Sequence, residues 1–454
     1  MARVKKSYGI IHLVILVSIG LYAYFQIAYK IGQTDFHKLI IHYILAFISF
    51  VAIYINFSSK HKILLGLSIG FRLMFFFAIP ELSQDIYRFI WDGRLMINGI
   101  NPYITSPDML MQKAELPFGM ADELYPKLTE LSASNRSNYP PVSQFFYVIA
   151  AWVSPDTFFG SILCLKAIIL SADLLSYRMA VLILEHLRMD KSRVFLYLLN
   201  PLIIVEGMGN LHMEPLMVAF LLVGMFFWLK QRNILSGVFI GLSIATKLLP
   251  LLLLPFMVKG HRKFQFKAFL QKDILTISSI SIGVTLAGFL CFMDLSNADQ
   301  YLRTIGLWFN RFEFNASLYY VFRWIGYQVS GYNMIAYFGK GLAALSMIFL
   351  IYLALKSTAN RKSQINAMLL AFIIYFLLAT TVHPWYLILP LALSIFSRYS
   401  FPVIVWSLSI FFSYHAYETD GFQESSSWLL AEYALFFLSM LLLYEHPGAF
   451  RWKR

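Results

Sequence analysis

The chain has 454 residues, of which 59% are hydrophobic and 13% are charged, and its mean hydropathy is +0.65. Soluble domains carry about 25% charged residues, so this composition excludes an ordinary soluble protein and predicts an integral membrane protein. Apolar segments of helical length recur along the whole chain, which favours an all-α bundle over a β-barrel. The two cysteines, Cys164 and Cys291, lie in separate apolar segments and predict no disulfide framework.

The formal net charge of +13 would suit a nucleic-acid ligand, but its distribution indicates membrane topology instead. Most of the 37 lysines and arginines lie in short loops and tails between apolar segments. Such a bias marks the cytoplasmic side of a membrane protein. The sequence therefore predicts cytoplasmic N- and C-termini, membrane lipids as surroundings and no nucleic-acid partner.

The first three apolar segments alternate in direction across the membrane. Residues 8–29 are predicted to rise from the cytoplasm as an uncleaved signal anchor, because no small-residue cleavage site follows them. Residues 38–57 return to the cytoplasm and residues 63–80 rise again. The chain that follows is therefore expected on the outer side.

Residues 81–141 form the predicted first outer loop, which contains eight acidic and five basic residues. An ordered loop of this length is usually functional. Residues 142–154 are too short to span comfortably and are expected at the membrane interface. Residues 158–185 then descend to a basic turn.

The later apolar segments are shorter and more often interrupted, with a second outer loop predicted at residues 294–315. In total the sequence predicts about 11–13 membrane segments, some of them short or broken. Broken helices suit a membrane only where their irregular ends line a cavity. The later segments are expected at residues 194–208, 216–229, 235–246, 248–257, 273–293, 332–355, 366–381, 387–397, 402–415 and 428–444.

Charged residues gather where the first outer loop begins, and charge is costly that close to lipid. In a helix Asp85, Arg88 and Asp92 would share one face. We expect Asp85 to be a general base that Arg88 holds ionised. Asp92 either orients an acceptor hydroxyl or pairs with Arg88 or Arg94. The alternative for the whole group is a salt-bridge ladder on an exposed helix.

Three more ionisable residues interrupt apolar segments. An unpaired lysine at the position of Lys247 costs about 2.5–3.5 kcal/mol, so it should have an anionic partner such as a lipid-linked phosphate, unless it snorkels to the interface. Arg72 suggests the same role, or a pair with Glu81 or a carboxylate of the outer loop. His383 precedes a proline at a helix break, where a phosphate contact and a backbone hydrogen bond both fit.

Polar residues also mark the break between the segments at 194–208 and 216–229. Glu206, His212 and Glu214 match no strong metal-ligand spacing, so we expect a hydrogen-bonded network there and no metal site. This tip, Lys247 and residues 383–386 are predicted to close around Asp85. Residues 315–317 form a glycosylation sequon, although such triplets are common by chance.

Motifs along the chain resemble, in the same order, those of polyprenyl-phosphate-dependent mannosyltransferases with the GT-C fold. The first-outer-loop signature consists of Asp85-Ile86-Tyr87-Arg88, Trp91-Asp92-Gly93-Arg94 and Gly99-Ile100-Asn101-Pro102-Tyr103. The resemblance covers about residues 80 to 390 and continues through Tyr139-Pro140-Pro141, Asn200-Pro201, Ala245-Thr246-Lys247 and His383-Pro384-Trp385-Tyr386. It is strongest to bacterial alpha-mannosyltransferases and more distant to the catalytic subunit of the first GPI mannosyltransferase. That subunit carries an Asp-x-Asp motif whose second acid is Tyr87 here.

The resemblance implies one transmembrane domain over residues 1–454, with residues 81–141 as its catalytic outer loop. It implies an inverting transfer of a hexose, most readily mannose, from a polyprenyl-phosphate donor to a hydroxyl of a glycan or glycolipid. The reaction is expected at the outer face of a bacterial plasma membrane and needs no nucleotide, cofactor or metal. The alternatives are another lipid-linked sugar, such as arabinofuranose or glucose, and a secondary transporter. A transporter would not need the acidic outer loop.

The resemblance also implies roles for individual residues. Asp85 and Asp92 are expected to be catalytic, and Lys247, Arg72 and His383 are expected to bind the donor phosphate. Tyr139 is interpreted first as part of a rigid entry to the next helix and second as a substrate contact. The full set of expected substrate-binding residues is Arg88, Trp91, Arg94, Asn101, Tyr139, Asn210, His212, Glu214, Trp385 and Tyr386.

Overall fold

The computed structural model describes residues 2–257, 269–293, 298–310, 312–357, 360–418 and 422–446. Within these ranges the secondary structure is helical, apart from one isolated β-bridge between Phe314 and Thr381. The predicted all-α class is therefore confirmed. Seven helices in the described part of the chain are long and apolar enough to cross a membrane, at Gly9–Tyr29, Phe36–Phe57, Phe158–His186, Lys272–Leu290, Ile335–Lys356, Arg361–Leu378 and Ser426–Glu445. The chain is thus a multi-pass membrane protein.

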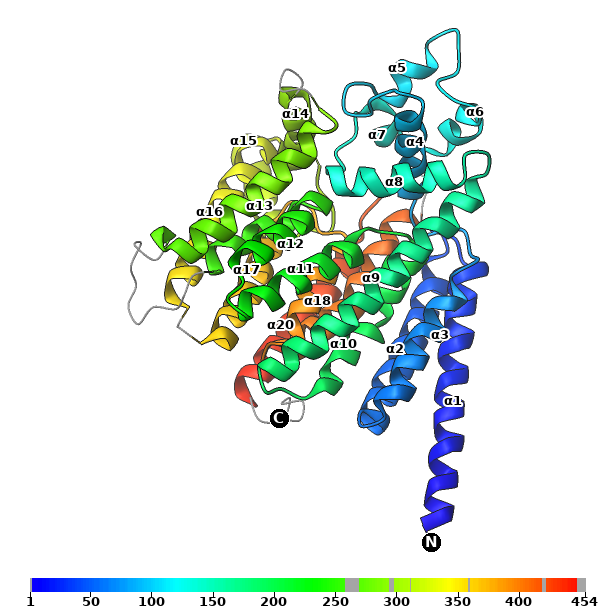
Figure 1. The fold of residues 1–454 in the computed structure, drawn as a ribbon, viewed down its shortest axis with the longest axis vertical. Helices are drawn as coiled ribbons and strands as arrows, with labels where there is room; N and C mark the ends of the chain where they lie inside the picture. The colour runs from blue at the N-terminus through cyan, green and yellow to red at the C-terminus, as the bar shows by residue number, and fades with distance from the viewer. Residues whose placement is uncertain are drawn as a thin grey trace.

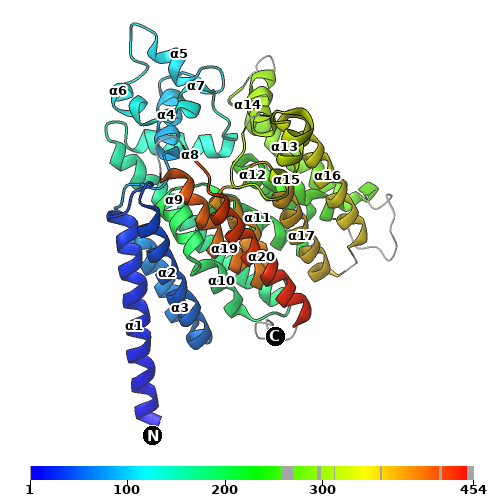
Figure 2. The same ribbon diagram turned by 180° about the vertical axis from the view of Figure 1, so that it is seen from behind.

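The first three helices are α1 (Ala2–Tyr29), α2 (Phe36–Phe57) and α3 (His61–Met74), which lie side by side in both views (Figures 1 and 2). They match the predicted segments, except that α3 ends at Met74 rather than at residue 80. Residues 75–77 form a turn after α3, and Pro80 disfavours helical geometry at Ile79 before the chain enters the outer loop. This exit delivers the outer loop directly onto the end of the bundle.

The first outer loop is folded into short helices rather than left irregular. They are α4 (Asp85–Ile97), α5 (Pro107–Met111), α6 (Ala121–Leu124), η1 (Tyr125–Lys127) and α7 (Glu130–Ser134). Figure 1 shows these helices together at the end of the molecule opposite to the start of α1. The next helix, α8 (Pro141–Val153), runs across the view instead of along the long helix α9 (Phe158–His186). This orientation agrees with the expected position at an interface.

The next span is broken, as the sequence predicts. After η2 (Lys191–Val194) and α10 (Phe195–Leu198), the π-helix η3 (Ile203–Gly209) meets α11 (Glu214–Leu229) at a bend of 111°. Helices with this wide hydrogen-bond pattern are rare and are frequent at functional sites. Thirteen of the sixteen residues of α11 are buried, which suits a helix that is apolar on all sides. The break therefore carries its polar residues into the interior of the bundle.

The second half of the chain contains two helices that hydropathy did not indicate. The predicted outer loop at 294–315 holds α14 (Ala298–Asn310), and α15 (Leu318–Ser330) follows it. Both combine apolar and charged residues, so their average hydropathy hides them. The other elements are α12 (Asn233–Thr246), η4 (Leu249–Phe256), α13 (Lys272–Leu290), α16 (Ile335–Lys356), α17 (Arg361–Leu378), η7 (Pro384–Leu387), α18 (Ile388–Ser394), α19 (Ser400–Ser409), η8 (Ile410–Tyr417) and α20 (Ser426–Glu445).

Some of the basic residues that set the predicted topology lie outside the described residues. They are Lys259, Arg262, Lys263 and Lys267 in one loop, and Arg451, Lys453 and Arg454 in the tail. The described ends of the chain are still informative. The start of α1 and the end of α20 lie at the same end of the bundle, opposite to α4 and α5 (Figure 1).

Candidate functional site

Asp85 is the first residue of α4, and its carboxylate stands at the edge of a buried polar cluster. Its side chain is 37% exposed, and its Oδ2 lies 3.5 Å from Nε2 of His212. The N-terminal end of a helix also favours negative charge. Burial raises the pKa of the Asp85 carboxyl, but the hydrogen bond from His212 and the positive charges of His212 and Lys247 outweigh it. The pKa of Asp85 therefore lies below its ordinary value, and the group is ionised at neutral pH.

His212 lies in the break between η3 and α11, held between two carboxylates. Its Nδ1 is 3.1 Å from Oε2 of Glu206, on the side opposite to Asp85. Glu206 also accepts hydrogen bonds from Nδ2 of Asn210 at 2.9 Å and from the hydroxyl of Tyr414 at 2.8 Å. All four side chains behind Asp85 are buried. Of the three residues expected to form a network at this break, Glu206 is hydrogen-bonded and lies beside His212, whereas Glu214 pairs with Lys247 instead.

A column of stacked rings extends from His212 to the second half of the chain. The ring centroids of His212 and Trp385 are 3.9 Å apart, and those of Trp385 and His383 are 4.3 Å apart with an interplanar angle of 5°. The ring of Phe314 stacks on His383 at 4.7 Å. Trp385 is only half-buried. The stacking therefore holds the His212 ring in one orientation, and Trp385 is the partly exposed aromatic residue next to it.

Lys247 ends α12 and forms an ion pair with Glu214 at the start of α11. Its Nζ is 2.5 Å from Oε1 of Glu214, whose side chain is fully buried, whereas the side chain of Lys247 is 24% exposed. The ammonium also lies 5.6 Å from the ring centroid of Tyr386, within the range of a cation–π contact. The anionic partner expected for Lys247 is therefore present within the chain. The exposed fraction leaves the ammonium able to meet a further anion.

Arg72 lies away from this cluster and has a partner of its own. Its side chain is 1% exposed, and its Nε is 2.6 Å from Oδ2 of Asp173 in α9. Its Nη1 donates to the backbone oxygens of Ser68 and Leu198. The expected pairing with Glu81 or an outer-loop carboxylate is wrong. The buried guanidinium ties α3 to α9, and its protein partners argue against the expected contact with a donor phosphate.

Asp92 and Arg88 form a buried ion pair with each other. Nε of Arg88 is 2.7 Å from Oδ1 of Asp92, and Nε2 of Gln144 is 2.8 Å from Oδ2 of Asp92. The side chain of Asp92 is fully buried, so neither oxygen can reach a substrate. Arg88 therefore supports Asp92 rather than Asp85, and Asp92 joins α4 to α8. This pairing with Arg88 is the second of the two roles expected for Asp92, and the burial of its carboxylate argues against the first.

Four other residues of the outer-loop motifs contact protein groups. Trp91 is fully buried, with its ring 4.9 Å from that of Phe118. Arg94 donates to the backbone oxygens of residues 154 and 155, and Asn101 donates to that of residue 292. The backbone oxygen of Tyr139 accepts a hydrogen bond of 2.6 Å from the hydroxyl of residue 103. These residues shape the outer loop, and Tyr139 alone among them is half-buried near Asp85.

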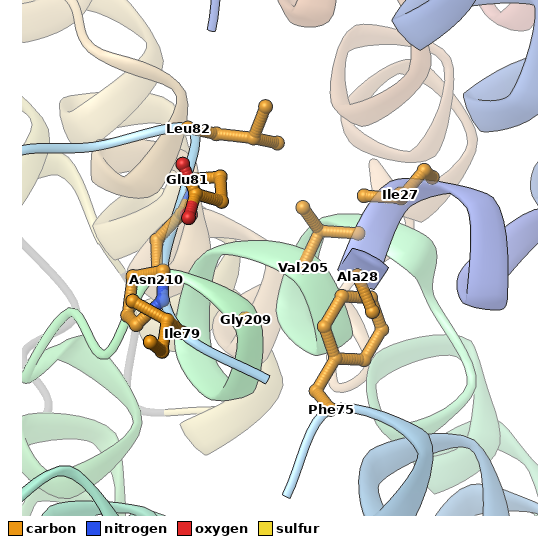
Figure 3. Close-up of a pocket in the computed structure, with 10 residues that line it drawn as sticks. Ile27, Ala28, Phe75, Ile79, Glu81, Leu82, Val205, Gly209 and Asn210 are labelled. Carbon is orange, nitrogen blue, oxygen red and sulfur yellow. The ribbon is translucent and has the colours of Figure 1, made fainter. Parts of the chain in front are cut away.

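A small cavity lies beside the turn that carries Glu206 and Asn210. Figure 3 shows Glu81 and Leu82 on one side of it, and Ala28 of α1 with Phe75 on the other. Its volume is about 10 Å³, which is room for about one water molecule. It is therefore too small for a sugar or a lipid chain. Among the described residues, no group of three or more His, Cys, Asp or Glu is arranged to hold a metal ion.

Phe314 and Tyr414 belong to the site but have no sequence signal. Tyr414 is 208 residues from its partner Glu206. Aromatic residues are common throughout this chain, which has 42 phenylalanines and 27 tyrosines, so neither position stands out. Only the fold brings them to the cluster.

Together the fold and this cluster define a multi-pass helical membrane protein that presents an ionised carboxylate and a lysine beneath a folded outer loop. Residues 43–260 match the family described as alpha-(1->6)-mannopyranosyltransferase, N-terminal domain. This range includes Asp85, His212 and Lys247, and it ends before His383.

Two curated relatives carry the same printed name, alpha-(1->6)-mannopyranosyltransferase A. The chain is 24% identical to the Mycobacterium tuberculosis protein over 288 aligned residues. The aligned stretch covers 60% of this chain and 50% of the relative. It is 24% identical to the Corynebacterium glutamicum protein over 186 aligned residues, a stretch that covers 40% of this chain and 35% of the relative. It is also 25% identical over 147 residues to alpha-(1->6)-mannopyranosyltransferase B of Corynebacterium glutamicum, which covers 32% and 23%.

The chain thus spans half or less of the length of these relatives. No solved structure matches it. The matches confirm the resemblance to bacterial mannosyltransferases that the motifs indicate.

Proposed function

We propose that the chain transfers mannose from a polyprenyl-phosphate donor to a hydroxyl of a glycan or glycolipid. The observation that carries the proposal is the partly exposed, ionised carboxylate of Asp85, close enough to the partly exposed Lys247 for their charges to interact. The names of the relatives support mannose as the sugar. A lipid-linked donor suits a site that lies among membrane helices.

The proposed chemistry is a single displacement with inversion. Asp85 accepts the proton of the acceptor hydroxyl as the hydroxyl oxygen attacks the anomeric carbon of the sugar. The bond from that carbon to the phosphate oxygen breaks, and its electron pair leaves with the polyprenyl phosphate. In this scheme Lys247 and His383 stabilise the growing negative charge on the phosphate. The reaction requires neither a cofactor nor a metal.

His212 and Glu206 support the base without touching the substrate in this scheme. The buried Glu206 holds one side of the imidazole, so the other nitrogen faces Asp85 in a fixed direction. Trp385 and Tyr386 border the same region and are half-buried, so their rings are available to a sugar or a lipid phosphate. The structure gives the other expected substrate residues protein partners, and we leave them out of the proposed site.

We further propose that the site lies on the outer face of a bacterial plasma membrane, with both termini in the cytoplasm. The outer-loop helices lie at one end of the bundle, and the start of α1 and the end of α20 lie at the other, which supports this arrangement (Figures 1 and 2). The acidic outer loop and the basic short loops of the sequence agree with it.

The test is transfer by the purified protein in detergent, with radiolabelled sugar donors and a short mannan acceptor. We expect transfer from polyprenyl-phosphate mannose, none from GDP-mannose, and no loss on adding EDTA. Faster transfer from polyprenyl-phosphate glucose or arabinofuranose would change the proposed sugar. Absence of transfer from every lipid-linked donor, with uptake of labelled solute into proteoliposomes, would favour a transporter instead.

A further inference from the structure

A second buried polar cluster lies next to the ring column and takes no part in the proposed chemistry. Its centre is Asn315, which is 1% exposed and has a backbone φ of +48°. A non-glycine residue seldom adopts this left-handed geometry, and it persists only where surrounding contacts determine it. The burial of Asn315 also excludes glycosylation of its side chain in the folded protein.

Three polar groups of Asn315 are bonded to other segments. Its backbone N–H donates to Oε1 of Glu424 at 2.5 Å, and its backbone oxygen accepts from the hydroxyl of Tyr433 at 2.7 Å. Its side-chain Nδ2 donates to the backbone oxygen of Val382 and to Oε1 of Glu432, each at 3.3 Å. These bonds connect the chain before α15 to the chain before η7 and to the start of α20.

The cluster stands directly beside the isolated β-bridge. The backbone N–H of Phe314 donates to the oxygen of Thr380 at 3.0 Å, and that of Val382 donates to the oxygen of Phe314 at 2.9 Å. Phe314 precedes Asn315, and Val382 precedes His383. A bridge this short has only two ladder hydrogen bonds, so it depends on the contacts around it. The bonds of Asn315 supply those contacts.

The bridge places one end of the ring column. Phe314 stacks on His383, and the stack continues through Trp385 to His212, which lies 3.5 Å from Asp85. A shift of the bridge would therefore remove the support behind His383. Asn315 does not contact Asp85 itself, so any effect must pass through this column.

We propose that Asn315, Glu424 and Glu432 form a positioning clamp, which fixes the Phe314 bridge and thereby holds the ring column against His212. The clamp itself follows from geometry alone, whereas its effect on turnover rests on the proposed function. Glu424 also accepts a hydrogen bond from the hydroxyl of Tyr320, so it joins α15 to the clamp. No residue of the clamp is a catalytic residue.

Glu432 offers a sharp test because its two oxygens are used differently. Its Oε1 accepts from Asn315 and, at 2.8 Å, from Nε1 of Trp406. Its Oε2 is buried and has no hydrogen-bond partner among the described residues. Glutamine can keep both bonds through its own Oε1, whereas leucine removes both at nearly the same volume. Glu432→Gln and Glu432→Leu are therefore a matched pair.

The measurement is the accessibility of the bridge, which does not depend on catalysis. Thr381→Cys is introduced into a chain with Cys164 and Cys291 replaced by alanine, because Thr381 is 7% exposed. The purified protein in detergent is treated with a maleimide, and the labelling rate reports how often the bridge opens. We expect labelling about tenfold or more faster in Glu432→Leu than in Glu432→Gln, since two buried hydrogen bonds are lost.

Two further variants keep the test decisive. Ser409→Ala removes a contact of 3.4 Å between α19 and the backbone of Glu432 without touching Asn315, so its labelling rate should match the parent. Tyr433→Phe removes the hydroxyl that donates to the backbone oxygen of Asn315. It should therefore give a smaller increase in the labelling rate, and it remains a test if Glu432→Leu fails to fold. Equal labelling rates for the parent and Tyr433→Phe, or for the two Glu432 variants, would overturn the clamp.

Transfer by the same proteins then separates the clamp from the proposed function. With an active parent, Glu432→Leu should lower kcat and Glu432→Gln should restore it. A parent without transferase activity would refute the proposed function and leave the labelling result standing. Faster labelling of Glu432→Leu with unchanged kcat would show that the column is not needed for turnover and would overturn the positioning role.

Discussion

Asp85 and Asp92 show how burial assigns different roles to two carboxylates of one helix. Both lie on α4, but Asp85 is 37% exposed whereas Asp92 is fully buried. Both oxygens of Asp92 already accept hydrogen bonds, one from Arg88 and one from Gln144. Asp92 is therefore poorly placed to take a proton from a substrate. Asp85 lies beside His212 and is partly exposed. Of the two, only Asp85 has the geometry of a general base.

Replacing Asp85 by asparagine should abolish most of the turnover while leaving the fold intact. Asn keeps the size of the side chain but cannot accept the proton of the acceptor hydroxyl, so kcat should fall by about 10²-fold or more. Donor affinity and melting temperature should stay close to those of the parent. Asp122→Asn, at an exposed position of the same loop, serves as the control. A kcat for Asp85→Asn within threefold of the parent would remove Asp85 from the mechanism.

The pH dependence of transfer should report the contact between His212 and Asp85. Transfer requires ionised Asp85, and the pKa of this group is held below its ordinary value by His212 and Lys247 against the opposing effect of burial. In the parent, kcat should therefore persist as the pH falls to below that ordinary pKa. In His212→Gln the burial effect prevails, the pKa of Asp85 rises, and the loss of kcat should begin at higher pH. An unchanged acid limb would show that His212 does not tune Asp85.

Lys247 pairs with Glu214 and is proposed to bind the donor phosphate, and a single substitution cannot separate these two roles. Lys247→Met would leave the fully buried carboxylate of Glu214 without its partner. Breaking such a pair is costly, by up to about 3–5 kcal/mol, so the variant should melt at lower temperature. Adding Glu214→Gln removes the stranded charge and should recover most of the stability. Thermal unfolding of the single and double variants in detergent measures this recovery.

The double variant then tests contact with the donor phosphate. A lost charge-assisted hydrogen bond to phosphate costs about 1.5–3 kcal/mol, so donor affinity should fall by about 10- to 150-fold. Glu214→Gln alone is the matched control, because it keeps the ammonium. If the double variant binds the donor as tightly as Glu214→Gln does, Lys247 serves the fold and not the substrate.

Among the elements, α4 and α8 approach each other most closely at Gly93. A Cβ at this position would lie 2.2 Å from the backbone oxygen of Tyr147, a distance that no side chain can occupy. Only glycine therefore lets the two helices meet at the depth at which Asp92 reaches Gln144. This contact sets the position of α4, and α4 carries Asp85 at its first turn.

Gly93→Ala should consequently separate the two helices and lower both stability and activity. The clash involves backbone atoms of α8, so overpacking should cost about 1–3 kcal/mol or more. Gly70→Ala in α3 is the control, because a Cβ there meets nothing within 4 Å and alanine is the better helix former. Limited proteolysis of residues 81–141 and the melting temperature measure the difference. Equal resistance of the two variants would contradict the close α4–α8 contact.

The apolar elements were predictable because lipid imposes a strong signal of length and hydropathy. Helices α1, α2, α9 and α20 accordingly lie within a few residues of their predicted bounds. Helices α14 and α15 were missed, since each is only 13 residues long and mixes polar or charged residues with apolar ones, which lowers its average hydropathy. The outer loop was predicted as a unit, but its short helices depend on contacts such as that of Trp91 with Phe118.

The sequence motifs identified most residues of the site, but they did not indicate which of these residues pair with each other. Asp85, His212, Lys247 and His383 were all singled out, and the fold does bring them together. The partner of Arg72 lies 101 residues away in sequence, and nothing local indicates it. Buried ion pairs of this kind are decided by which helices pack together. A single sequence does not determine that choice.

At the scale of the whole molecule, the charge pattern and the shape lead to the same orientation. The outer-loop helices α4 to α7 lie at one end of the bundle, and the start of α1 and the end of α20 lie at the other (Figure 1). Basic residues favour the cytoplasmic side, so the acidic loop and Asp85 should face outward. An outward site can meet a lipid-linked sugar but not a nucleotide sugar, which is made in the cytoplasm.

Cysteine labelling in intact cells tests this orientation directly. In a chain without its two native cysteines, a cysteine at Asp122 should react with a membrane-impermeant maleimide, because this position is exposed in the outer loop. A cysteine at Lys62, exposed in the first turn of α3, should react only after the cells are permeabilised. Labelling of Lys62→Cys alone in intact cells would place Asp85 on the cytoplasmic face. A nucleotide sugar would then become the better candidate for the donor, and the lipid phosphate would lose its part in the mechanism.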